Sequence, residues 1–159
     1  MRFFRCLQDR ERLKELLESI NLDFFPPISK QEGSIDSYAD KLLNEGSFLF
    51  MQENGKYVGI LGYFISNHIM NIDLVWVPEE KRKSSPIFYR LSKYLIQHES
   101  AFNGKVRVKT WKGNLDMVPI LEKIGFELTK EIAEDYIPER TSLVYEVEFS
   151  HLKRYFGVA

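Results

Sequence analysis

The fold is decided by the stretch IDLVWVPEEKRKSSPI, residues 72–87. Its first half is rich in apolar and β-branched residues, which predicts a strand, and Pro78 ends that strand because proline cannot donate to a sheet. A charged loop follows, and from Ile87 to Leu95 apolar residues recur at helical spacing. The stretch therefore predicts a strand, a charged loop and a helix, with an acidic residue, Asp73, inside the strand.

The flanking segments complete an α+β pattern, with strands and helices mixed along the chain. Asn54-Gly55 is a strong signal for a two-residue hairpin turn, and Ser66-Asn67-His68 predicts a second turn, so the three middle strands should form an antiparallel meander. The strands are expected at residues 3–7, 48–51, 57–65, 69–77, 106–111, from Phe126, and at 143–149. The helices are expected after the caps Asp9 and Ser34, from Pro86 to Asn103-Gly104, and over Met117–Ile124 before Gly125.

The composition is that of an ordinary folded domain. The chain has 159 residues, 44% of them apolar and 14% aromatic, which is enough for a core and argues against disorder. We expect a single domain over residues 1–159, because no repeat, low-complexity tract or linker interrupts the pattern. With 22 Lys and Arg against 23 Asp and Glu, the net charge is −1, so nucleic-acid binding is not expected as the main task.

Cysteine and histidine usage gives no sign of a metal site. The one cysteine, Cys6, excludes a disulfide within the chain, and the three histidines (68, 98 and 151) are not spaced as ligands, so we expect them on the surface. The N-terminus lacks the features of a signal peptide, and no stretch approaches the ~20 apolar residues that span a bilayer. We therefore expect a cytoplasmic protein without membrane contact.

The element order and the strand at 72–77 resemble the GNAT superfamily of N-acetyltransferases, as a divergent member. In that family the fourth strand carries an acid and ends in V-x-P-like residues, and a loop R-x-x-G-x-G or A then opens a helix. Asp73 stands at the position of the strand acid, and Val77-Pro78 matches the strand end. The loop has serines where the family has glycines.

The loop can be aligned in two registers. One starts at Lys81 without a gap, and the other starts at Arg82 with one extra residue. We prefer the Arg82 register, because it makes Ser85 the N-cap of the helix and Pro86 its first residue, where no amide donor is needed.

A second segment, NLDMVPILEKIGF at residues 114–126, resembles the family's N-x-x-A-x-x-x-Y-x-K-x-G-F. Asn114, Lys123, Gly125 and Phe126 match this pattern. Leu121 stands where the family commonly has a tyrosine that protonates the leaving thiolate, and Tyr136 is our candidate for a replacement acid.

The resemblance implies a three-layer fold in which a mostly antiparallel mixed sheet is splayed between its fourth and fifth strands and flanked by about four helices. It implies acetyl-CoA, or another acyl-CoA, as cofactor, and transfer of the acyl group to a small-molecule or peptide amine. Asp73 would be the general base. The residues expected to hold the cofactor are Val75, Trp76 and Val77 through the strand backbone, Lys81, Arg82, Lys83, Ser84, Ser85 and Ile87 at the pyrophosphate, and Asn114 at the pantetheine arm.

Several alternatives stay open at this point. Asp73 could instead face solvent on the opposite sheet face from Trp76, and Asn114 could be only a helix cap. The aromatic loop Phe24–Pro27 could be a lid on the core or could line the acceptor cleft. The whole chain could be a GNAT-shaped binding or assembly module that has lost the chemistry, and it could act as a monomer or as a homodimer.

Overall fold

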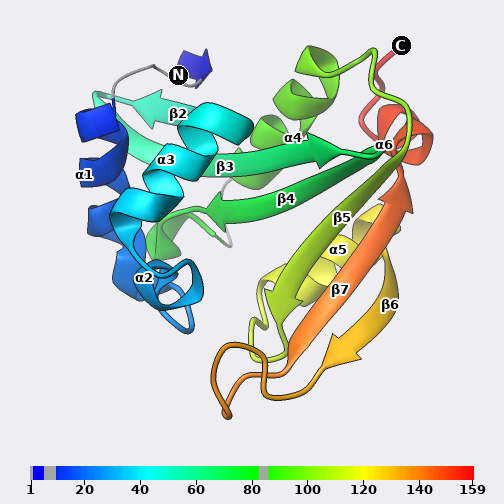
Figure 1. Ribbon diagram of the computed structural model, residues 1–159. Coiled ribbons are helices and arrows are strands. Elements are labelled where there is room, and N and C mark those ends of the chain that lie inside the picture. The colour runs from blue at the N-terminus through cyan, green and yellow to red at the C-terminus, as the bar shows by residue number, and fades with distance from the viewer. Residues whose placement is uncertain (1, 6–9, 83–85) are drawn as a thin grey trace.

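The computed structural model describes residues 2–5, 10–82 and 86–159 (Figure 1). Within these ranges the strands form one seven-stranded sheet in the order β1-β2-β3-β4-β5-β7-β6. The strands are β1 Arg2–Arg5, β2 Ser47–Glu53, β3 Lys56–Ser66, β4 Ile69–Trp76, β5 Lys105–Trp111, β6 Glu127–Ile132 and β7 Ser142–Glu148. The helices are α1 Arg10–Ile20, α2 Ile28–Gln31, α3 Ile35–Glu45, α4 Ile87–His98, α5 Met117–Ile124 and α6 Phe149–Tyr155, with 3-10 turns at η1 Asn21–Asp23 and η2 Glu79–Lys81.

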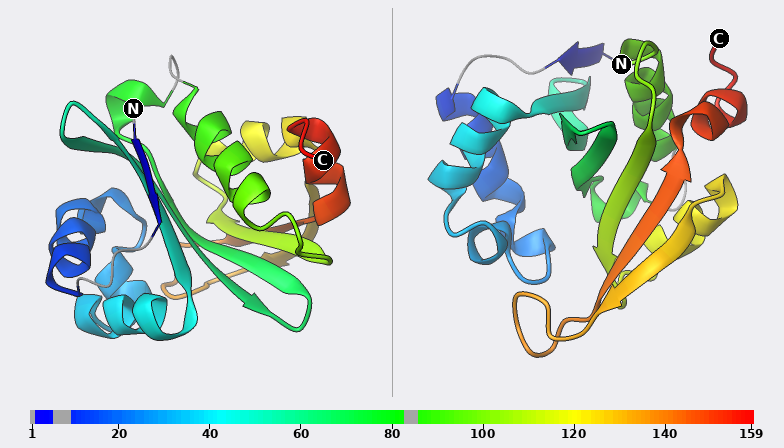
Figure 2. Two further views of the ribbon diagram at one scale, coloured as in Figure 1. Left: turned by 90° about the horizontal axis from the view of Figure 1, so that it is seen from above. Right: turned by 45° about the vertical axis from the view of Figure 1, so that its right-hand side comes forward.

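The helices cover the sheet from both sides, which gives the three layers that the sequence predicts. Figure 2 shows α1 to α3 on one face and α4 to α6 on the other. Each layer buries its own apolar cluster: Leu17 and Leu42 lie under the first set of helices, and Leu95 and Leu152 under the second. Among the described residues, no helix has the length and apolar character needed to cross a membrane.

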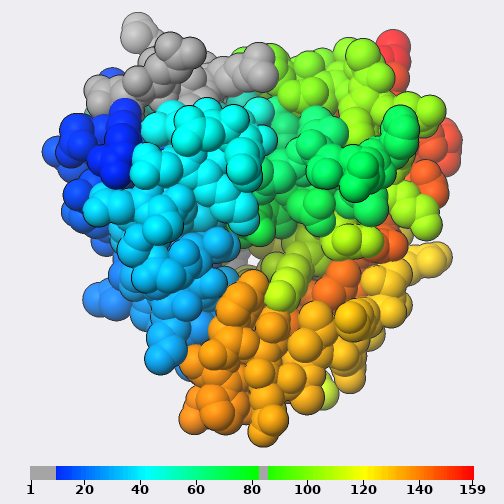
Figure 3. Space-filling model, in the orientation of Figure 1, coloured from blue at the N-terminus to red at the C-terminus, as the bar shows by residue number. Residues whose placement is uncertain are grey.

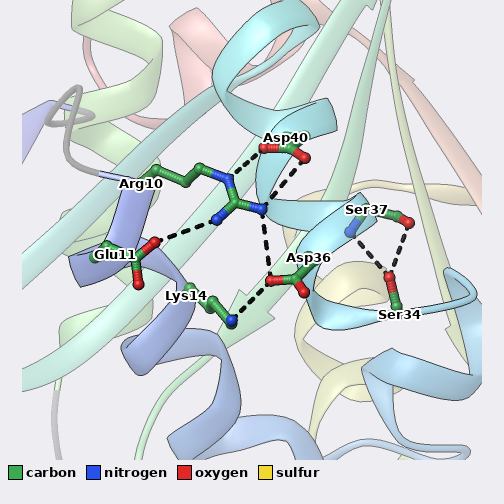
Figure 4. A network of polar contacts seen from close by, with 7 residues as sticks. All are labelled: Arg10, Glu11, Lys14, Ser34, Asp36, Ser37 and Asp40. Carbon is green, nitrogen blue, oxygen red and sulfur yellow. Dashed lines mark hydrogen bonds and ion pairs between the residues drawn. The ribbon is translucent and has the colours of Figure 1, made fainter.

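A network of charged side chains joins α1 to α3 (Figure 4). The Nε atom of Arg10 donates to Asp40 at 2.7 Å, and the Lys14 ammonium lies 3.0 Å from Asp36, which Arg10 also reaches at 3.5 Å. These groups are partly exposed, so each pair adds little stability by itself. Together they link the start of α1 to the first two turns of α3.

The predicted turns and helix caps are present in the structure. Asn54 and Gly55 adopt φ values of 52° and 77°, and Asn67 and His68 adopt 52° and 61°, so both hairpins have the positive-φ turns that match the twist of paired strands. The Ser34 hydroxyl accepts from the Ser37 amide as the N-cap of α3. The expected cap Asp9 lies outside the described residues.

The pairing of β4 with β5 is short, and this confirms the predicted splay. The two strands run parallel and pair only from Ile69–Lys105 to Ile72–Val108. Beyond that point β4 continues to Trp76 and β5 to Trp111 without pairing to each other, and they separate visibly in Figure 1. The edges that face each other therefore carry backbone groups that no neighbouring strand uses.

The C-terminal segment differs from the sequence expectation. The last strand was expected to include Phe149, but it ends at Glu148, and Phe149 begins α6 with its amide donating to the Gly104 carbonyl. This helix buries Leu152 in the core, and its His151 is not a free surface residue, since Nε2 lies 2.8 Å from the Ile124 carbonyl oxygen. A short amphipathic tail could not be recognised as a helix from its length alone.

Other element ends shift by one residue. The strand expected from Phe126 begins at Glu127, and Phe126 is a buried core residue after Gly125, which ends α5 in the left-handed conformation. Helix α4 begins at Ile87 with Pro86 in the cap position, so Pro86 is not the first helical residue. Ser85, its expected cap, lies outside the described residues.

Candidate functional site

A cleft of about 530 Å³ opens where β4 and β5 separate. Apolar side chains of both strands, α4 and α5 line its inner part: Val75, Phe88, Val108, Met117 and Ile120. In Figure 3 the surface is hollowed where the blue α1–α2 region, the light green β5 and the orange β6–β7 loop meet. The cleft thus has an apolar interior and a mouth formed by three segments that are distant in sequence.

A β-bulge in β4 decides where Asp73 points. Gly62 of β3 pairs with Leu74, but the next residue of β3, Tyr63, pairs with Ile72, so Asp73 is the extra residue. Leu74 and Trp76 pack under α1 to α3, whereas Ile72 and Val75 pack on the opposite face. The bulge places Asp73 on the same face as Trp76, which corrects the simple alternation in which the two would lie on opposite faces.

The Asp73 carboxylate lies beside a buried tyrosine and a second acid. The hydroxyl of Tyr38 on α3 donates to Asp73 Oδ2 at 3.1 Å. Burial raises the pKa of Tyr38 well above its ordinary value, with the nearby charges of Asp73 and Glu32 adding to the effect, so the hydroxyl stays a donor.

The second acid is Glu32, at the end of α2. Burial raises the pKa of the Glu32 carboxyl, and the charge of Asp73 raises it further. Lys41, 3.8 Å from Glu32, opposes this rise. Sequence reasoning missed Glu32, because a glutamate before Gly33 in a loop has no pattern that would distinguish it from a solvated turn residue.

The predicted acid Tyr136 lies on the β6–β7 loop, outside the residues that line the cleft, and its side chain is 43% exposed. The Lys109 ammonium donates to its hydroxyl at 3.0 Å and to Asp135 at 2.6 Å. Burial opposes ionisation of Asp135, but hydrogen bonds from Lys109 and Ser142 outweigh it and lower the Asp135 pKa. Lys109, which does line the cleft, therefore joins Tyr136 to the edge of the site.

Residues 23–25 bridge the two walls of the cleft, and we call them the bridging segment. Asp23 accepts from the Trp76 indole on β4 at 2.7 Å, and the Phe25 ring lies 4.5 Å from that of Trp111 on β5. Arg140 donates to the Phe25 carbonyl at 2.6 Å. Phe24 and Phe25 both line the cleft, so this loop forms part of its wall.

Two of the basic residues predicted to bind pyrophosphate lie at the other end of the cleft. Lys81 and Arg82 are among its lining residues. The Arg82 Nε atom donates to the Val77 carbonyl at 2.8 Å, which ties the loop to the end of β4, and the Lys81 ammonium is 3.9 Å from Glu53. Of the backbone groups expected to pair with pantetheine, the Val77 carbonyl is therefore already engaged.

The start of α4 offers amide groups to this end of the cleft. Its cap residue, Pro86, provides no side-chain hydrogen bond, and within residues 2–5, 10–82 and 86–159 no side chain caps its first amides. The Ile87 side chain is fully buried and packs beside Leu91, under Gly59 of β3, where a Cβ would lie 2.6 Å from Leu91. Ile87 can therefore contribute only its backbone. Lys83, Ser84 and Ser85 lie outside the described residues.

Asn114 has a capping hydrogen bond and also lines the cleft. Its Oδ1 atom accepts from the Met117 amide at 3.2 Å, which caps the turn before α5, and its Nδ2 atom donates to Thr110 at 3.1 Å. The residue also lines the cleft, together with Val75 and Trp76 of the predicted cofactor set. Leu121, by contrast, is 1% exposed and lies in the core, so its position in α5 brings no polar group to the site.

The structural comparisons identify the fold, and the sequence comparisons give no match to a protein-family model or to a curated protein. The ribosomal-protein-S18-alanine N-acetyltransferase from Escherichia coli aligns with a TM-score of 0.73 at 11% identity, covering 93% of this chain and 94% of the other. A candidate GNAT-family acetyltransferase from Desulfovibrio desulfuricans aligns with a TM-score of 0.66 at 17% identity, covering 93% of this chain and 98% of the other. An aminoglycoside 6'-N-acetyltransferase complexed with coenzyme A aligns with a TM-score of 0.69 at 13% identity, covering 94% of this chain and 97% of the other.

The chain therefore has the fold of the GNAT N-acetyltransferases, as the sequence resemblance predicted. The similarity extends over nearly the full length of each of these proteins, and the low identities agree with a divergent sequence. Among the residues that the structure describes, no group of three or more His, Cys, Asp or Glu could hold a metal ion.

Proposed function

We propose that this chain is an acyl-CoA-dependent N-acyltransferase that transfers an acetyl group from acetyl-CoA to a small-molecule or peptide amine, and that it acts as a single domain. The observation that supports this proposal most directly is the cleft between β4 and β5. It combines an apolar interior, the cations Lys81 and Arg82, the first turn of α4 with Phe88 in the lining, and the Asp73 carboxylate.

The residues present fit an acyl-CoA. Its pyrophosphate would be held by the first amides of α4 and by Lys81, since a helix N-terminus favours anions. The unpaired edge of β4 near Val75 would receive the pantetheine amides as an added strand would, and Asn114 would contact the same arm. When bound, the cofactor supplies the acyl group as a thioester, which an amine can attack.

Asp73 would act as the general base. The amine must lose a proton to become a nucleophile, and Asp73 is exposed at the cleft with its orientation fixed by the Tyr38 hydroxyl. Burial raises the pKa of the neighbouring Glu32, and the charge of Asp73 raises it further, so the two carboxyl groups lie close enough to interact. Tyr136 stays the candidate for the acid that protonates the thiolate. The assignment of Asp73 as base has the stronger support, because Asp73 lines the cleft and Tyr136 does not.

The second candidate is a module of the same fold that binds acyl-CoA without turnover. The burial of Leu121 favours it, because the family's usual tyrosine acid is replaced by a core side chain. The two candidates differ in one measurable property, which is acetyl transfer to any amine by a protein that binds acetyl-CoA.

Calorimetric titration with acetyl-CoA tests the shared part of both candidates. We expect saturable binding that weakens in Lys81→Ala and Arg82→Ala, more so at low salt, because screening reduces the contribution of exposed charges. Lys130→Ala is the matched control, since it removes an exposed lysine on β6 away from the cleft. Absence of binding at millimolar acetyl-CoA would refute both candidates, and equal affinity in all variants would place the cofactor elsewhere.

A further inference from the structure

Arg140, on the β6–β7 loop, is a buried cation at the mouth of the cleft. Its side chain is 5% exposed and is part of the cleft lining. Nε donates to the Ser142 hydroxyl at 2.8 Å, Nη1 donates to the Phe25 carbonyl at 2.6 Å, and the guanidinium carbon lies 5.1 Å from the Tyr136 ring centroid. All three of these partners are uncharged.

Within the described part of the chain, no carboxylate lies within 4.0 Å of the guanidinium. The Oδ2 atom of Asp135, the acid on the same loop, accepts from the Lys109 ammonium at 2.6 Å and from the Ser142 hydroxyl at 2.7 Å. Arg140 donates to that Ser142 hydroxyl, so its hydrogen-bond link to Asp135 runs through Ser142. A buried guanidinium without a carboxylate in direct contact is costly. Burial lowers the pKa of Arg140, and the charge of Asp135, which lies beyond Ser142, only partly opposes this, although arginine remains charged. The fold bears this cost at the mouth of the cleft.

One edge of the guanidinium is free. The hydrogen bonds of Arg140 use Nε and Nη1, and none uses Nη2. Every fully buried side-chain nitrogen or oxygen in the described residues has a hydrogen-bond partner. Nη2 is therefore not fully buried, and Arg140 is one of the residues that line the cleft.

Groups of opposite charge line the same cleft. Asp73 of β4 and Arg140 are both among its lining residues, and Glu32 lies beside Asp73. Tyr38, which bonds Asp73, also lies near Tyr136, and Tyr136 packs against Arg140. An acid and a cation without a direct carboxylate partner thus line one cleft, which is an arrangement that suits a zwitterion.

We propose that the acceptor is an amino acid, whose carboxylate binds Arg140 while its ammonium group faces Asp73. This inference rests on the proposed acyltransferase function and specifies its substrate. The guanidinium donates charge-assisted hydrogen bonds to the carboxylate. After Asp73 removes the ammonium proton, the amine nitrogen bonds to the acyl carbon and the carbon–sulfur bond breaks. The thiolate then takes up a proton, and an N-acyl amino acid leaves.

The test compares amino acids with their decarboxylated amines: L-lysine with cadaverine, L-ornithine with putrescine, L-phenylalanine with phenethylamine and L-leucine with isopentylamine. Acetyl transfer is followed by thiol release from acetyl-CoA and by mass spectrometry of the product. We expect the wild-type protein to favour at least one amino acid over its amine in kcat/KM. Arg140→Met should reduce that preference about 10- to 100-fold, because it removes a charge-assisted hydrogen bond to a substrate carboxylate.

Two further variants distinguish binding of the substrate carboxylate by Arg140 from a structural effect on the bridging segment. Phe25→Ala disturbs the bridging segment and leaves the guanidinium in place, so it should lower kcat/KM for both members of a pair by the same factor. Arg140→Lys keeps a cation and should retain part of the preference for the amino acid. Binding of acetyl-CoA, measured by calorimetry, should change little in all three variants and shows that each is folded.

The inference is overturned if kcat/KM for the amines equals that for the amino acids, or if no amino acid of the panel is acetylated by a protein that binds acetyl-CoA. It is also overturned if Arg140→Met lowers kcat/KM for both members of a pair by the same factor. Failure of the wild-type protein to bind acetyl-CoA would be a different result, because it would refute the acyltransferase proposal itself.

Discussion

The substitution Asp73→Asn tests the proposed general base with little disturbance of the fold. Asparagine has nearly the same shape and can still accept the hydrogen bond from Tyr38, but it cannot take up a proton at neutral pH. A positioned base contributes about 10²- to 10⁴-fold to rate, so turnover should fall by that factor. The limb of the rate profile that reports loss of the Asp73 proton should also flatten.

The structure indicates why stability and cofactor binding should change little. Asp73 is exposed and keeps one hydrogen bond at 3.1 Å, and a typical net contribution of such a bond is about 1 kcal/mol. For a chain of this length that is a shift of about 2–4 °C in Tm at most. The apolar residues that would contact the cofactor, such as Val75, lie on the other face of β4, so the Kd for acetyl-CoA should stay near the wild-type value.

The assay combines calorimetry, thermal unfolding and steady-state acetylation from pH 5 to pH 9. Asp116→Asn is the matched control, since Asp116 is another exposed acid that lines the cleft but does not lie beside Tyr38 or Glu32 in the acid cluster. Wild-type turnover in Asp73→Asn would remove Asp73 from the mechanism. Loss of acetyl-CoA binding or a large drop in Tm would show that the bulge depends on the carboxylate, and the base would have to be sought elsewhere.

Three other substitutions test separate parts of the structure. Because the folded-state pKa of Glu32 is raised, ionisation of this group costs stability as the pH rises above the unfolded value of about 4.5. Glu32→Gln should therefore become more stable relative to wild type as the pH rises through that value in denaturant unfolding, and a pH-independent difference would contradict this. Asn114→Ala should cost about 1 kcal/mol through loss of a cap, whereas Asp116→Ala, which provides no cap hydrogen bond, should cost less; equal losses would argue against the capping role. In Gly113→Ala the new Cβ would lie 2.0 Å from the Trp111 ring, so the indole must move, and KM for the acceptor should rise while the Kd for acetyl-CoA is kept; an unchanged KM would separate this ring from acceptor binding.

The meander of β2 to β4 and the separation of β4 from β5 could be predicted from the sequence, because local signals and the element order indicate them. Asn54-Gly55 can form only a few kinds of turn, and the strand that ends at Pro78 is followed by a recognisable loop and helix. These elements, in this order, define the fold even at the identities of 11–17% found among the three solved structures.

The details of the site were less predictable because they depend on contacts between distant segments. Simple alternation along β4 gave Asp73 the wrong face, since the bulge becomes visible only in the pairing with Gly62 and Tyr63. Glu32 and Arg140 have no local motif. Glu32 comes to lie beside Asp73 only because the end of α2 packs there, and Arg140 reaches the cleft through the β6–β7 loop. Asp73, Lys81 and Arg82 could be placed in advance because they lie within the segment that resembles the family.

The bridging segment has a consequence for how this cleft can change over evolutionary time. Beyond Ile72 and Val108 the two walls share no ladder of backbone hydrogen bonds, and residues 23–25 connect them through one indole, one aromatic contact and one guanidinium. The sheet does not depend on these residues for its pairing. Substitutions there can therefore alter the size and polarity of the entrance. In the proposed reaction they would change which acceptors are admitted without altering Asp73 or the first turn of α4.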